Sequence, residues 1–447
     1  DYVRGLGCNL IWLNPCFDSP MQDAGYDVRD YRKTAERYGT NEELESLMAT
    51  AHEKGMRVLL DLVPGHTSIE HEWFRKSQES ERNELSDRFI WSSSVWDKPK
   101  DYYWISGLTE RDGCAMVNFF NSQPALNYGF ANVTLPWQLS YTDERVQATF
   151  DAILDVMRFW LKKGCDGFRV DMAGSLVKDD PTGEATASLW QRAQEMLRRE
   201  YPDAVMISEW SDPEKAVKLA GFQGDFYLVF NAEGYLSLMR SGKSSYFHKE
   251  AAGDFNIFLD EYTKRYAATK QDGFICFVTG NHDEDRAAKE FDTSELKLCY
   301  AFLMTMPGVP FVYAGDEIGM KHLPLPDKEG GYNRTGARTP IQWSRERNFG
   351  FSSAPESQLY LPQDPRADAP NVDTQMKESD SLWSFLHRVL ELRASERALR
   401  ADSSFESVYV GEKGYPYVYR RGDLLLAMNV TTEDKTIPLA FGEPVFL

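Results

Sequence analysis

The sequence predicts an α/β protein, a (β/α)8 TIM barrel with an inserted domain and a C-terminal antiparallel β domain. Three observations predict it. Short apolar runs alternate with longer helical patterns along most of the 447 residues, as parallel β/α units do. One connection, residues 66–143, is far longer than the others and rich in aromatic residues. After residue 395 the alternation gives way to short strand patterns joined by tight turns.

The expected barrel strands are short apolar runs bounded by turn residues. They cover residues 9–13, 57–63, 167–171, 205–209, 225–230, 274–279 and 309–313. A barrel of eight strands needs one more, and the chain begins in what looks like the end of a helix. We therefore expect the first barrel strand, and also the end of the C-terminal β domain, to be missing from this chain.

Helical patterns fill the connections between these runs. The first helix begins at a capping box, Thr40 with Glu43, and ends at Gly55. Its apolar positions repeat at helical spacing: Leu44, Leu47, Met48 and Ala51. A second helix covers residues 146–161, carries its apolar residues on one stripe and stops at Gly164. Similar patterns cover residues 189–200, 296–306 and 381–392.

These patterns divide the chain into four predicted parts. They are the first part of the barrel (1–65), the inserted B domain (66–143), the rest of the barrel (144–395) and a partial C-terminal β-sandwich (396–447). The aromatic residues of the insert could stack on sugar rings or form the insert's own small core, and the second interpretation is favoured for most of them. They are Trp91, Trp96, Tyr102, Tyr103 and Trp104.

Composition and charge exclude several classes of protein. A content of 42% apolar and 13% aromatic residues excludes disorder, and no apolar run is long enough to span a membrane. The net charge of −19 repels phosphate backbones, so nucleic acid is not an expected partner. The six cysteines show no metal-like spacing and are interpreted as buried thiols, which favours a reducing, cytoplasmic compartment. They are Cys8, Cys16, Cys114, Cys165, Cys276 and Cys299.

Ionisable residues gather where the predicted strands end, which is where barrel enzymes hold their active sites. Asp171 and Glu209 end two of the predicted strands, and Asp283 comes shortly after a third. Folding gains nothing from carboxylates placed together, because like charges disfavour each other's ionisation. A metal-binding cluster is the competing interpretation, but no ligand spacing predicts zinc. Hydrolysis of glycosidic bonds requires such a carboxyl pair.

The chain resembles the α-amylase family, glycoside hydrolase family 13, over essentially its whole length. The matching segments occur in the family's order: GYDVRDY (25–31), DLVPGH (61–66), QPALN (123–127), GFRVD (167–171), SEW (208–210) and TGNHD (279–283). The resemblance implies a catalytic barrel, an inserted B domain and a C-terminal β-sandwich. It also implies an enzyme that cleaves or transfers α-glucosidic bonds.

The resemblance assigns roles residue by residue. Asp171 matches the catalytic nucleophile, and Arg169 would keep it ionised. Glu209 matches the general acid/base, and Asp283 matches the third acid, which binds sugar hydroxyls. Residues that match the sugar site are Tyr26, Asp27, His66 and His282. The implied mechanism is double displacement with retention, with the Asp171 and Glu209 carboxyl groups ~5–5.5 Å apart.

Substrate preference depends on two further segments. GYD (25–27) and RTPIQW (338–343) resemble members that remove single glucose units from chain ends, and an Arg338–Asp27 pair could enforce that exo action. Met172 matches neither α-1,6 nor α-1,4 specialists, so the linkage stays open. The leading hypothesis is a hydrolase of short malto- or isomalto-oligosaccharides. The alternatives are a transglycosylase or isomerase such as a trehalose synthase, an endo-acting amylase, and a non-catalytic sugar-binding member. The sequence predicts no oligomeric state.

No cofactor is expected, and calcium is doubtful. Gly65 stands where the family usually has an Asn that ligates a calcium ion between the B domain and the barrel. Ala125 replaces the usual Asp of the insert motif. The sequence therefore predicts no metal ligands.

Overall fold

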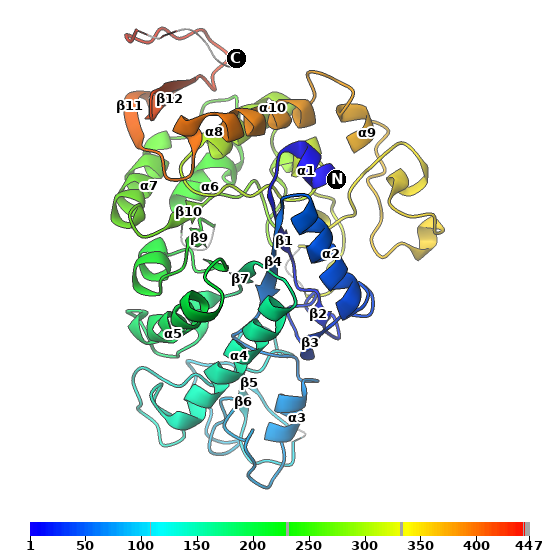
Figure 1. Cartoon of the computed structure of the whole chain (residues 1–447), viewed down its shortest axis with the longest axis vertical. Helices are drawn as coiled ribbons and strands as arrows, with labels where there is room; N and C mark the ends of the chain where they lie inside the picture. The colour runs from blue at the N-terminus through cyan, green and yellow to red at the C-terminus, as the bar shows by residue number, and fades with distance from the viewer. Residues whose placement is uncertain (108, 229–231, 331–333, 441, 443–447) are drawn as a thin grey trace. The chain divides into compact units, whose positions relative to one another are not determined.

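The computed structural model describes residues 1–107, 109–228, 232–330, 334–440 and 442, which fold as two compact units (Figure 1). One unit holds residues 8–225, and the other holds residues 1–7 together with residues 226–447. Residues 229–230 of one predicted strand, and the last few residues of the predicted β domain, lie outside the described residues.

A parallel sheet forms the centre of the unit of residues 8–225. Its strands lie in chain order: β1 (Leu10–Leu13), β4 (Arg57–Leu62), β7 (Gly167–Val170), β8 (Val205–Ser208) and β9 (Gly224–Phe226). Phe226, the last residue of β9, belongs to the other unit. β7 is wholly buried, as the strands of parallel sheets are when helices cover both faces. In the register, Asp61 of β4 pairs with Arg169 of β7, which pairs with Ile207 of β8.

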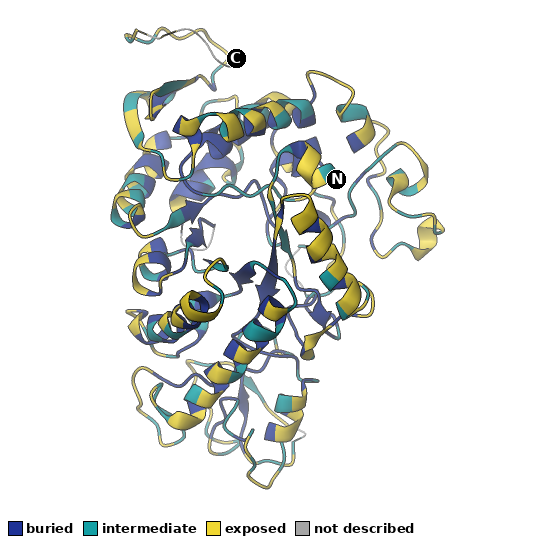
Figure 2. Ribbon diagram, viewed as in Figure 1, coloured by how far each residue is buried: buried dark blue, intermediate teal, exposed yellow. Residues whose placement is uncertain are grey.

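Helices pack on this sheet as the sequence predicts. They are α2 (Asn41–Glu53), α4 (Glu144–Lys162) and α5 (Glu184–Glu200), whereas α3 (Glu72–Ser77), which was not predicted, lies in the insert. The capping box at Thr40 is confirmed, since its hydroxyl accepts from the Glu43 N–H and the Glu43 carboxylate accepts from the Thr40 N–H. Figure 2 shows buried and exposed residues alternating along α2, α4 and α5, which is typical of amphipathic helices. Leu47 departs from the predicted apolar stripe of α2, because its side chain is 43% exposed.

The insert contains little regular structure. Besides α3 it has one antiparallel pair, β5 (Trp104–Ile105) and β6 (Ala115–Met116), and a similar short pair, β2 (Phe17–Asp18) with β3 (Asp30–Thr34), precedes it. Trp91 is buried, and Tyr102 and Trp104 pack edge to face with each other in a small aromatic cluster. Tyr102 and Trp104 are half-buried against the insert's own small core, whereas Trp91 packs in the main core of the unit. Trp96 and Tyr103 belong to neither core, because they are 91% and 82% exposed.

The second unit begins with α1 (Tyr2–Leu6) and resumes with α6 (Glu233–Met239), α7 (Phe255–Thr269) and β10 (Phe274–Cys276). α8 (Thr293–Thr305), α9 (Val372–Gln375) and α10 (Leu382–Ser395) follow. The strand predicted at residues 309–313 is wrong, because only one parallel bridge, Val278 with Phe311, forms there. The pairing does not continue to residue 313, because the Tyr313 N–H donates to the Thr279 hydroxyl, at 3.0 Å, instead of to a backbone oxygen.

The predicted antiparallel β domain is confirmed over the described residues. It consists of β11 (Phe405–Glu412), β12 (Tyr415–Arg421) and β13 (Leu424–Met428), with β12 in the centre. The buried ring of Tyr417 packs on Phe255 of α7, and that of Tyr419 packs on Phe302 of α8.

Two further predictions are tested by burial and helix composition. All six cysteines lie in the described part of the chain as thiols, and five are buried. Cys8 is the exception, since it lies before β1 and is only half-buried. Among the described residues, no helix is both long enough and apolar enough to cross a membrane.

Candidate active site

The buried guanidinium of Arg169 is the centre of the site in the unit of residues 8–225. Its Nη1 donates to Asp61 Oδ1 at 2.9 Å and to Asp171 Oδ1 at 3.0 Å, and its Nη2 forms an ion pair with Glu209 Oε2 at 2.8 Å. The Arg169 side chain is 2% exposed. We call these four residues, Asp61, Arg169, Asp171 and Glu209, the Arg169 cluster.

The parallel sheet brings the cluster together. Asp61 and Arg169 are register partners on β4 and β7, and Asp171 and Glu209 directly follow β7 and β8. The strand hydrogen bonding continues past the strand ends, because the Asp171 N–H donates to Leu62 O and the Glu209 N–H donates to Val170 O, both at 2.9 Å. Neighbouring strands that end at the same edge therefore present their last side chains side by side.

Charges in the cluster are unequal in number. Burial raises the pKa of Asp61 above its usual range, against the pull of the Arg169 guanidinium. Burial alone would lower the pKa of Arg169, but Asp61 and Glu209 raise it well above its usual value. One fixed positive charge thus serves three carboxyl groups. A water-poor site of this kind favours positive charge that develops on a substrate.

Asp61 has further partners that fix its orientation. Tyr26 donates its hydroxyl proton to Asp61 Oδ2 at 3.0 Å, and the Trp12 indole N–H donates to the same oxygen at 3.1 Å. The Arg169 guanidinium also lies over the Trp12 ring, 5.0 Å from its centre. Tyr26, predicted to line the sugar site, therefore lies within the hydrogen-bond network of the Arg169 cluster.

His66 is completely buried and neutral at ordinary pH, because burial lowers its pKa to about 4. Asn118 Nδ2 lies 3.0 Å from His66 Nδ1, and His66 Nε2 lies 3.0 Å from Tyr26 O. Since the amide nitrogen can only donate, Nδ1 accepts and Nε2 carries the ring proton. The insert residue Asn118 thereby sets the tautomer of His66.

Asp27 is also completely buried, and its carboxylate is used within its own loop. It accepts from Ser19 Oγ at 2.9 Å, from the Gln22 N–H at 2.9 Å and from the Asp23 N–H at 3.0 Å. Burial raises its pKa, and these donors oppose the rise. In the structure, the Asp27 carboxylate holds its own loop in place. Its contact with a sugar remains a prediction.

The remaining predicted site residues lie in the other unit, around Asp283 in the segment that follows β10. Arg334 Nη1 donates to Asp283 Oδ1 at 2.6 Å, Arg338 Nη2 donates to the same oxygen at 3.1 Å, and His282 Nε2 lies 3.2 Å from Oδ2. Burial would raise the pKa of Asp283, but these three neighbours lower it to about 2. Asp283 is therefore ionised throughout the ordinary pH range.

Arg338 has both of its described partners in the group around Asp283, since its Nε also donates to His282 O at 2.8 Å. The sequence analysis proposed that Arg338 pairs with Asp27. These residues belong to different units, and each has partners within its own unit.

Sequence reasoning missed three members of these groups. Asp61 lies in the DLVPGH segment without an assigned role, and the signal that could have found it is its register opposite Arg169. Asn118 and Arg334 lie in irregular segments whose approach to His66 and Asp283 no local pattern reveals.

The residues at the expected calcium position do not fit a calcium ion. Gly65 offers no side-chain oxygen, and a Cβ there would lie 2.7 Å from Asn118 Nδ2. Two oxygens that could ligate a cation, Asn118 Oδ1 and Ser175 O, instead accept from the ammonium of Lys178 at 2.8 and 2.6 Å. Burial lowers the pKa of this lysine to about 8. Among the described residues, no group of three or more His, Cys, Asp or Glu side chains is placed to hold a metal ion.

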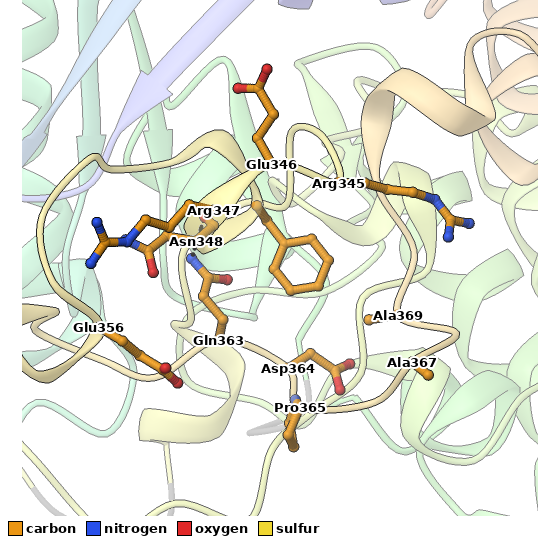
Figure 3. A pocket seen from close by; sticks show the side chains of 11 residues that line it. Arg345, Glu346, Arg347, Asn348, Glu356, Gln363, Asp364, Pro365, Ala367 and Ala369 are labelled. Atoms are coloured by element: carbon orange, nitrogen blue, oxygen red, sulfur yellow. Dashed lines mark hydrogen bonds between the residues drawn. The ribbon is translucent and has the colours of Figure 1, made fainter.

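A hollow of about 520 Å³ lies within residues 345–369 of the second unit (Figure 3). Figure 3 shows the Gln363 amide turned toward Asn348, whose backbone oxygen accepts its N–H at 3.3 Å. Arg345, Arg347 and Asp364 are also among its lining residues. No described lining residue is one of the predicted site residues.

Comparisons with known proteins agree with this fold. Residues 1–402 match the family model for the alpha amylase catalytic domain. The chain is 31% identical to the trehalose synthase/amylase TreS of Mycolicibacterium smegmatis, over 89% of this chain and 71% of that protein. It is 29% identical to the oligo-1,6-glucosidase of Heyndrickxia coagulans, over 96% and 86% of the two chains.

Among solved structures, the trehalulose synthase MutB from Pseudomonas mesoacidophila MX-45 superposes with a TM-score of 0.79 at 24% identity, covering 97% of this chain and 85% of that one. This likeness supports the barrel fold. The protein is an enzyme that acts on glycosidic bonds. It belongs to the α-amylase family, glycoside hydrolase family 13, whose members act with retention and need no organic cofactor.

Proposed function

We propose that this enzyme is a retaining α-glucosidase that acts on short malto- or isomalto-oligosaccharides, with Asp171 as nucleophile and Glu209 as general acid/base. The observation that carries the proposal is the Arg169 cluster, in which Asp171 and Glu209 bond to the two ends of one buried guanidinium. Carboxyl groups held this way are near neighbours, as a retaining mechanism requires.

In the first step, an Asp171 oxygen attacks the anomeric carbon while Glu209 donates its proton to the leaving oxygen. The products are a glucosyl ester of Asp171 and the shortened sugar. In the second step, Glu209 takes a proton from water, which attacks the same carbon and releases glucose and free Asp171. Arg169 holds Asp171 ionised before the attack, and Asp283, ionised by its three cationic neighbours, would accept hydrogen bonds from sugar hydroxyls.

The exo preference is a further part of the proposal. It is supported by the GYD (25–27) and RTPIQW (338–343) segments and by relatives named as an oligo-1,6-glucosidase and a glucan 1,6-alpha-glucosidase. The thiol state of all six cysteines supports a reducing compartment, the cytoplasm, as its location.

The test is hydrolysis of 4-nitrophenyl α-glucoside, maltotriose and isomaltotriose, with the Asp171→Asn variant in parallel. The expected product is glucose released as the α-anomer, and the variant should release none. The preferred trisaccharide identifies the linkage. Release of the β-anomer would contradict retention, and cleavage of only longer glucans would contradict exo action.

A second candidate function is isomerisation of maltose to trehalose, which the 31% identity to a trehalose synthase/amylase favours. It differs only in whether water or released glucose receives the glucosyl group. Incubation with maltose distinguishes the two, because trehalose accumulates only if the released glucose is retained and re-attacks.

A further inference from the structure

Asp225 lies beneath the turn that carries Glu209. It is on β9 and pairs with Ser208 of β8. Its Oδ1 accepts from Ser208 Oγ at 2.6 Å, from the Trp210 N–H at 3.0 Å and from the Ser211 N–H at 3.3 Å. One carboxylate oxygen therefore holds the residue before Glu209 and the two residues after it.

The turn held by this oxygen is not a relaxed one. Ser211 has a φ of 55°, in the left-handed region that residues other than glycine rarely adopt. The Glu209 backbone is itself fixed on the other side, because its oxygen accepts from the Ala173 N–H at 3.1 Å. Asp225 thus supplies a restraint at the point where the β8 strand pairing ends.

Burying the Asp225 carboxylate has a desolvation cost. It is completely buried, and no described Lys, Arg or His side chain forms an ion pair with it. Its second oxygen, Oδ2, is buried and accepts no hydrogen bond from any described residue. Burial raises its pKa to about 7. Because these bonds need only an acceptor oxygen, the restraint on the turn depends on that oxygen and its position rather than on a negative charge.

We propose that Asp225 is a positioning residue for the general acid/base, fixing the turn of residues 208–211 so that the Glu209 carboxyl group reaches the leaving oxygen. This inference rests on the proposed role of Glu209. In this structure Glu209 Oε2 accepts from Arg169 and, at 2.9 Å, from the Met172 N–H, which defines where the turn delivers it. Proton donation requires an approach of roughly 2.6–3.2 Å between heavy atoms. A shift of the turn by about 1 Å therefore costs about 10²-fold in rate.

The test compares a poor leaving group with a good one in the intact chain. Maltotriose needs a proton on its leaving oxygen, whereas α-glucosyl fluoride does not. Because kcat/KM reports the first bond cleavage, Asp225→Ala should lower kcat/KM for maltotriose about 10²-fold and that for glucosyl fluoride less than about threefold. Asp225→Asn, which keeps the acceptor, should restore most of the maltotriose rate.

Two variants serve as controls. Glu209→Gln should show the same dependence on leaving group; if it hydrolyses maltotriose normally, the proposed function fails rather than this inference. Asp166→Ala removes a carboxylate at the opposite end of β7, where Oδ2 accepts from the Val58 N–H at 2.8 Å, and should not discriminate between the substrates. Equal losses on both substrates in Asp225→Ala, or no loss on either, would overturn the positioning role. So would a loss in Asp225→Asn as large as in Asp225→Ala.

Discussion

The two units arrange their charges in opposite ways. In the Arg169 cluster three carboxyl groups share one guanidinium, whereas in the other unit one carboxylate, Asp283, is surrounded by His282, Arg334 and Arg338. The first arrangement leaves carboxyl groups able to exchange a proton or form a bond. The second keeps a carboxylate permanently ionised as an acceptor. The ratio of positive to negative groups therefore separates groups suited to react from a group suited to bind.

The largest effect on activity is expected for Asp171→Asn, which removes the proposed nucleophile while keeping its size. We expect hydrolysis of 4-nitrophenyl α-glucoside to fall by at least about 10⁴-fold. The thermal midpoint should stay close to that of the parent, because the amide can still accept from Arg169. Retained activity in a pure, folded variant would assign the nucleophile elsewhere.

Removing the shared cation should have the largest effect on stability. Arg169→Met leaves Asp61, Asp171 and Glu209 without their common partner, so the free energy of unfolding at pH 7 should fall by about 3–5 kcal/mol. Denaturant titration measures it. Arg57→Met is the matched control, because this arginine is 64% exposed in its ion pair with Asp166 and should cost less than about 1 kcal/mol. Similar losses in both variants would contradict the shared-cation interpretation.

The Asp283 group predicts a smaller effect that depends on pH. The pKa of Asp283 is about 2 in the folded protein, below the roughly 3.9 of an unfolded chain, so its ionisation stabilises the fold above pH 4. That contribution, about 2–3 kcal/mol, should be lost as the pH falls from 4 towards 2. Asp283→Asn should flatten this part of the pH–stability curve. If the variant loses the same stability between pH 4 and pH 2, other carboxylates cause that loss.

The smallest effects concern the junction between the insert and the residues after β7. Lys178→Met leaves Asn118 Oδ1 and Ser175 O without their donor and should destabilise the protein by about 1–3 kcal/mol.

A chelator should leave the thermal midpoint of the unmodified protein unchanged within about 1 °C. A chelator-induced fall of several degrees would show that a bound cation, and not the ammonium, holds this junction.

Local patterns predicted the elements whose signals are local. The capping box at Thr40 and the apolar stripe of α4 are confirmed because each depends on residues three or four positions apart. The prediction of a strand at residues 309–313 was wrong because a strand requires a partner ladder, and the Tyr313 N–H donates to a side-chain hydroxyl instead of to the partner's backbone. Leu47 has helical spacing, but it lies on the exposed side of α2.

The same division applies to the site. Asp171 and Glu209 could be named because they follow recognisable strands in motifs of the family. The contacts of the Arg169 guanidinium with Asp61, Asp171 and Glu209 could not be predicted, since they depend on the register of three strands. Asp225 was invisible for the same reason. Its sequence position shows only a strand residue, and its role arises from pairing with Ser208.

Lys178 has a consequence for how this protein responds to its surroundings. A bound ion stabilises a fold by mass action, so its contribution rises and falls with the free concentration of that ion. The Lys178 side chain between Asn118 and Ser175 is covalently part of the chain, so its presence there does not depend on the concentration of any free ion. At this junction, the insert is therefore held by a side chain of the polypeptide itself.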